Sequence, residues 1–119
     1  MILEKRLSYH RCSCPCVSGQ DRGKGKVAEM LENGTAAGID HFLVCSPATT
    51  VTQVHSINSF LASCAAAYPM CTAFGTLHPY AENVEADFQQ LRSLQLRGVK
   101  LHPDFQNFPI DDPRAYPMY

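Results

Sequence analysis

The stretch GVKLHPDFQNFPIDDPRAYPMY, which spans residues 98–119, contains the clearest indication of the fold. Its first six residues are typical of a buried strand that ends at a proline, because proline has no N–H to donate to a β-ladder. Side chains two positions apart on a strand project to the same face, so we expect Lys100 and His102 to share one face. On the other face, Val99 and Leu101 are expected to pack against helices.

The second half of this stretch predicts a helix start. Asp112 is a favoured N-cap residue, and Pro113 is favoured at the first helical position. We therefore expect RAYPMY to begin a helix that leads toward a further strand.

Upstream of residue 98, helical and strand patterns alternate. Apolar runs predict two buried strands, and apolar spacing with capping residues predicts three helices. The strands are expected at 41–46, 70–77 and from 98, and the helices at 27–38, 51–68 and 83–97. This order is typical of an α/β fold with parallel strands and right-handed crossovers. Two architectures fit it: an open doubly wound sheet and an arc of a (β/α)8 barrel.

In both architectures functional groups gather at the carboxyl ends of the strands. Two successive strands here end in Leu-His-Pro, at His78 and His102. His102 and Lys100 are the candidate catalytic residues, since an imidazole beside a lysine can act as metal ligand, general base or substrate clamp. His78 and Gln106 are candidate substrate-binding residues. Each also has a structural interpretation: a bond from His78 to a loop carbonyl, and loop packing for Gln106.

Composition restricts the classes of function. The chain has 119 residues, enough for one domain, with 45% hydrophobic and 18% charged residues. A net charge of -1 gives no reason to expect nucleic acid or an anionic membrane as partner. The N-terminus does not resemble a signal peptide, and prolines interrupt the uncharged stretch 41–81, which argues against a membrane helix. We therefore expect a cytoplasmic protein.

Six cysteines occur in the chain. Three of them lie in apolar surroundings and are expected in the core, whereas Cys12, Cys14 and Cys16 form an unusual Cys-x-Cys-x-Cys run. This run could hold a soft metal or act as a redox centre, but zinc ligands usually come as two spaced pairs and no second pair follows. Residues 1–26 are expected to be an irregular leader, and 27–119 the folded part.

The stretches GTLHPY at 75–80 and GVKLHPDFQNFPIDDPRAYPMY resemble the middle of the amidohydrolase-related family of metal-dependent hydrolases and decarboxylases. In that family a Gly-x-Lys-x-His-Pro strand precedes a loop ending in Asp-Asp-Pro and a helix with a tyrosine. The resemblance covers roughly residues 27–119 and implies an arc of about strands 2–4 of a TIM barrel. It implies that Lys100 and His102 line the active site, on the fourth strand, for a small-molecule substrate.

The same resemblance implies a divalent metal, usually zinc, bound by a His-x-His pair on the first strand and by residues on later strands. No His-x-His occurs in this sequence. We therefore expect a fragment of such an enzyme that binds no metal alone and is inactive alone. The alternative is a noncatalytic α/β module whose open strand edges pair with a partner chain, for example the other half of a split barrel. A thiol-based metal or redox protein is the third interpretation.

Overall fold

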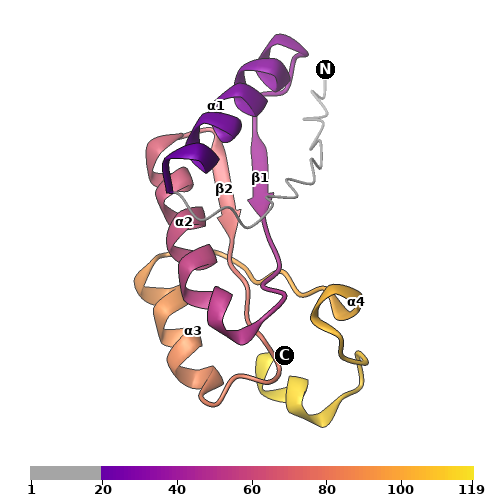
Figure 1. Cartoon of the computed structure of the whole chain (residues 1–119). Coiled ribbons are helices and arrows are strands. Elements are labelled where there is room, and N and C mark those ends of the chain that lie inside the picture. Colours follow the sequence, from indigo (N-terminus) through magenta and orange to yellow (C-terminus); the bar gives the residue numbers. More distant parts are fainter. Residues whose placement is uncertain (1–19) are drawn as a thin grey trace, which may run out of the picture.

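The computed structural model describes residues 20–119, which form a mixed α/β fold (Figure 1). Its elements in chain order are α1 (Gln20–Ala36), β1 (Phe42–Cys45), the 3-10 helix η1 (Val51–Gln53), α2 (Val54–Ala67), β2 (Cys71–Phe74), α3 (Val84–Ser93), α4 (Pro103–Gln106) and the 3-10 helix η2 (Pro113–Met118). The expected alternation of helices and strands is confirmed as far as β2 and α3. No helix in this part of the chain is long and apolar enough to cross a membrane.

The two strands pair in parallel, with Phe42 opposite Cys71 and Cys45 opposite Phe74. A parallel pair needs a crossover, and α2 supplies it. Both strands point toward the end of the molecule where α4 and the C-terminal segment lie (Figure 1). The strand ends predicted to carry function therefore lie beside the segment after residue 98.

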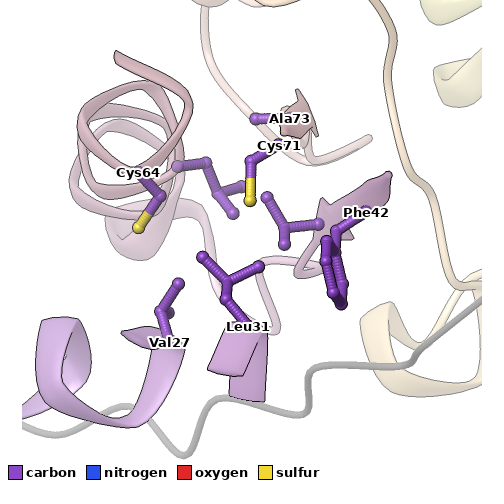
Figure 2. Packing of buried hydrophobic residues seen from close by; sticks show 8 residues of the cluster. Val27, Leu31, Phe42, Cys64, Cys71 and Ala73 are labelled. Carbon is purple, nitrogen blue, oxygen red and sulfur yellow. The ribbon is translucent and has the colours of Figure 1, made fainter. Parts of the chain in front are cut away.

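The first core cluster lies between one face of the strand pair and the helices α1 and α2. Figure 2 shows Val27 and Leu31 of α1 directed toward Cys64 of α2 and toward the strand residues Phe42 and Cys71. These side chains are buried. The opposite face of the pair is less covered, since Leu43, Thr72 and Phe74 are only half-buried.

The helices agree with the sequence except at their ends. Helix α1 begins at Gln20, inside the leader expected to be irregular, because the apolar period that marks a helix in sequence starts only at Val27. Asn83 caps α3 as expected, with its Oδ1 accepting from the Ala86 N–H at 3.0 Å. Helix α3 ends at Ser93, earlier than predicted, and the left-handed residue that follows is Gln95 (φ 57°) and not a glycine.

The third strand was predicted wrongly as a full strand. Only one parallel bridge joins Gly75 to Val99. The extended segment 98–101 is short because α4 begins directly after His102, its N-cap. The expected packing of the other face is confirmed: Val99 and Leu101 lie against a second core cluster. The buried members of that cluster are Leu77, Leu91, Phe108, Ala115 and Met118.

The helix start at Asp112 is confirmed, but the helix type differs from the expectation. The Asp112 Oδ1 accepts from the Arg114 N–H at 2.9 Å, and Pro113 occupies the first turn. The segment then continues as a 3-10 helix to Met118, with Pro117 inside it. Because Pro117 has no N–H, it cannot make the i→i−4 bond that an α-helix needs there.

Candidate functional site

The continuation of β2, residues 75–79, is buried at every position and connects the sheet to the predicted site. The Gly75–Val99 bridge fixes its register against the segment 98–101. Continued alternation from this bridge places Thr76 opposite Lys100 and His78 opposite His102. In the structure the two Leu-His-Pro ends are linked through Gln106, which bonds to the Leu77 carbonyl and to the His102 N–H.

On the β1 side, the continuation of β2 is bound by a helix side chain and not by a strand. If the ladder went on, the backbone of Thr76 would pair with residues 46–48. Instead, the Thr76 N–H donates to Asn58 Oδ1 at 2.8 Å, and Asn58 Nδ2 donates to the Thr76 carbonyl at 3.0 Å. The Ala48 N–H donates to Thr76 Oγ1 at 3.1 Å. The strands β1 and β2 thus separate around the amide of Asn58.

On the side of residues 98–102, the side-chain amide of Gln106 also takes the place of a strand-to-strand bond. The bridge consists of the Gly75 N–H bonded to the Gly98 carbonyl at 2.9 Å and the Lys100 N–H bonded to the Gly75 carbonyl at 2.7 Å. If the parallel ladder continued, the Leu77 N–H would bond to the Lys100 carbonyl, and the His102 N–H would then bond to the Leu77 carbonyl. Here the His102 N–H donates to Gln106 Oε1 at 2.7 Å, and Gln106 Nε2 donates to the Leu77 carbonyl at 2.6 Å.

His78 lies at the end of the continuation and is only 4% exposed. Its Nδ1 accepts from the Tyr80 N–H at 3.3 Å, so the neutral ring carries its proton on Nε2. Nε2 is buried and makes no hydrogen bond to any residue that the structure describes. Burial lowers the pKa of His78, and the nearby Thr49 carbonyl opposes this shift without reaching hydrogen-bond geometry at Nε2.

His102 and Lys100 are both half-buried. His102 caps α4, with its Nδ1 accepting from the Phe105 N–H at 3.5 Å, and its ring stacks on Phe105 with 4.0 Å between ring centres. The backbone of Lys100 takes part in the bridge to Gly75. Because Nδ1 of His102 accepts a hydrogen bond, as Nδ1 of His78 does, the neutral forms of both rings carry their proton on Nε2.

Gln106 is 1% exposed, and both ends of its amide bind main-chain groups. A direct contact between Gln106 and substrate stays a prediction, and its position gives it a structural role as well. Two other histidines lie away from this site. His41 Nε2 lies 2.9 Å from Thr72 Oγ1, and His55 Nε2 lies 2.6 Å from Asp87 Oδ1 in a contact between α2 and α3.

Sequence reasoning missed Asn58. It is fully buried in α2, together with Val54, Leu61 and Cys64. A polar residue on the apolar stripe of a predicted helix was the available signal, because a buried amide needs hydrogen-bond partners.

A polar cluster attaches the C-terminal segment to the loop after β2. The Tyr80 hydroxyl donates to the Asn107 carbonyl at 2.9 Å, and the Arg114 guanidinium lies over the Tyr80 ring, 4.2 Å from its centre. Arg114 Nη2 also donates to Asp112 Oδ2 at 2.7 Å. The hydrogen bonds from the Arg114 side chain and backbone lower the pKa of Asp112.

Within residues 20–119, no three His, Cys, Asp or Glu side chains are arranged so that they could hold a metal ion. The described part of the chain therefore does not fit the metal that the family resemblance implies. The Cys12, Cys14 and Cys16 run lies outside the described residues.

No protein-family model matches the chain. No curated protein and no solved structure is significantly similar to it.

Proposed function

We propose that this chain forms an arc, about strands 2–4, of a metal-dependent amidohydrolase-like barrel that acts on a small molecule in the cytoplasm. The parent reaction is hydrolysis of a C–N, C–O or lactone bond, or decarboxylation of an aromatic or unsaturated acid. The metal of such an enzyme would need ligands from outside residues 20–119. The chain by itself is then expected to be inactive.

One observation supports the proposal: Gln106 bonds to both the Leu77 carbonyl and the His102 N–H, so the two successive Leu-His-Pro segments end close to each other. Parallel sheets are normally covered on both faces. The helices cover one face here, and the half-buried Leu43 and Phe74 on the other are consistent with an interior completed by further strands. The motifs Gly-x-Lys-x-His-Pro and Asp-Asp-Pro give the family resemblance.

In this proposal Lys100 and His102 bind substrate oxygen atoms. A lysine ammonium offers three N–H donors, and the neutral His102 ring carries its proton on Nε2. Donors fixed before the reaction stabilise negative charge that develops on an oxygen. His78 is more buried than His102, and its Nε2 is buried as well.

The first test is to read the coding sequence on both sides of this chain. We expect a His-x-His at the end of an upstream strand, and histidine and aspartate at the ends of downstream strands. A protein extended to include them would then be assayed with amides, lactones and unsaturated carboxylic acids. Lys100→Ala and His102→Ala should each lower kcat/KM about 100-fold.

His41→Ala is the matched control, because His41 lies at the amino end of β1 and is exposed. It should leave kcat/KM unchanged. The proposal fails if the flanking sequence has no such strands, or if the extended enzyme keeps its activity without Lys100 and His102.

A second candidate function is a noncatalytic module that adds a partner strand to β1. Among the described residues β1 pairs only with β2. The Phe42 N–H points to β2, where it donates to the Met70 carbonyl at 2.9 Å, so by alternation the Leu43 N–H faces the free edge. Leu43→Pro should therefore abolish association in sedimentation experiments and leave the β1–β2 pairing in place, whereas Val44→Pro should disrupt both.

A further inference from the structure

We infer that Gln106 is the positioning residue of the strand-end site, and that its buried amide sets the separation of His78 and His102. The catalytic consequence of this inference rests on the proposed function. The positioning itself concerns only residues 77–106 and can be tested in this chain.

The amide of Gln106 occupies the place of one ladder bond. Its Oε1 accepts from the His102 N–H and its Nε2 donates to the Leu77 carbonyl, so the orientation of the amide is determined by its partners. One side-chain amide thus replaces the direct N–H to carbonyl contact between Leu77 and His102. The two chain ends are held apart by the width of that amide.

Gln106 also holds His102 through its backbone. The Gln106 N–H donates to the His102 carbonyl at 2.9 Å, since His102 is the N-cap of α4 and Gln106 is the last residue of this helix. His102 is therefore bound at both its N–H and its carbonyl by one residue. A buried group with both polar ends satisfied has little freedom to move.

The two histidines follow directly from the groups that Gln106 binds. His78 directly follows Leu77, whose carbonyl accepts a hydrogen bond from Gln106. The backbone N–H of His102 donates to Gln106. Each ring accepts a backbone N–H at Nδ1, from Tyr80 and from Phe105, so both neutral rings carry a proton on Nε2. Gln106 therefore holds two imidazoles of one tautomer at a set spacing.

The test uses NMR spectroscopy of the isotopically labelled chain. It reads the imidazole nitrogen shifts of His78 and His102 together with amide hydrogen exchange at His102. Gln106→Asn keeps the amide but is one methylene too short to reach both partners. We expect the ring signals of both histidines to shift and the His102 N–H to exchange roughly tenfold faster.

Gln106→Glu distinguishes the effect of the bond to the His102 N–H from that of the bond to the Leu77 carbonyl. A carboxylate still accepts from the His102 N–H but cannot donate to the Leu77 carbonyl. The His102 amide should therefore stay protected while the His78 ring signals change. This variant decides the question if Gln106→Asn does not fold.

Asn58→Ala is the matched control, because Asn58 is an equally buried amide that binds Thr76 and does not contact His102. It should leave the ring and amide signals of His102 unchanged. The inference is overturned if folded Gln106→Asn leaves the nitrogen shifts of both rings unchanged. It is also overturned if Asn58→Ala changes the His102 signals as much as Gln106→Asn does.

The two proposals can fail separately. If the rings respond to Gln106 but the extended enzyme is active without Lys100 and His102, only the proposed function is wrong. If His102→Ala abolishes activity while the imidazole shifts do not change in Gln106→Asn, only the positioning role is wrong.

Discussion

Asn58 binds both backbone polar groups of Thr76, with hydrogen bonds of 2.8 and 3.0 Å, in the place where a neighbouring strand would bind them. Both residues are completely buried. Because water cannot reach the Thr76 N–H and carbonyl, their pairing depends on this one side chain. Gln106 also replaces a ladder bond, although it binds the carbonyl of one residue, Leu77, and the N–H of another, His102. Two helical amides thus terminate the sheet at its carboxyl end.

Asn58→Leu should lower the free energy of unfolding by about 3 kcal/mol, because it leaves a buried donor and a buried acceptor unpaired. Urea denaturation measures this change. Asn33→Ala, at an exposed position of α1, should change the same quantity by less than about 0.5 kcal/mol. Equal midpoints for wild type and Asn58→Leu would show that the two groups find other partners.

Gly98→Ala should destabilise the fold by about 2 kcal/mol through overpacking. A Cβ at Gly98 would lie 2.9 Å from three atoms of the Phe74 ring, closer than such contacts allow. The cost should fall in a Phe74→Leu background, where the ring is absent, so a double-mutant cycle gives a favourable coupling energy. Additive effects of the two substitutions would contradict the contact.

Leu77→Ala should lower the free energy of unfolding by about 3 kcal/mol, since Leu77 is completely buried in the second core cluster. Ile110→Ala is the matched control, because Ile110 is 71% exposed. Thermal and chemical denaturation of both variants check the difference. Similar values for the two would mean that the second cluster contributes little to stability.

His78 should make stability depend on pH. Burial lowers its pKa in the folded chain, so below the ordinary value of about 6.5 the unfolded chain binds more protons than the folded chain. The contribution of His78 is therefore fully present above about pH 6.5 and is lost as the pH falls toward the folded-state pKa. His78→Asn should flatten this part of the profile, measured by urea denaturation at a series of pH values. An unchanged pH profile in the variant would mean that His78 is protonated equally in both states.

The α/β alternation, the parallel pairing of β1 with β2 and the two Leu-His-Pro strand ends could be predicted from the residues alone. The same holds for the caps at Asn83 and Asp112. These features depend on local patterns, namely apolar period, capping side chains and proline, which act over a few residues.

How the sheet ends depends on long-range packing. Asn58 and Gln106 lie 18 and 29 residues from the main-chain groups that they bind at Thr76 and Leu77. No local pattern encodes a side-chain amide in place of a ladder bond, because the choice depends on which helix packs over the strand end. The same physics limited the third strand to one bridge: a side chain satisfies the backbone of His102, so the chain can leave the sheet without an unpaired buried N–H.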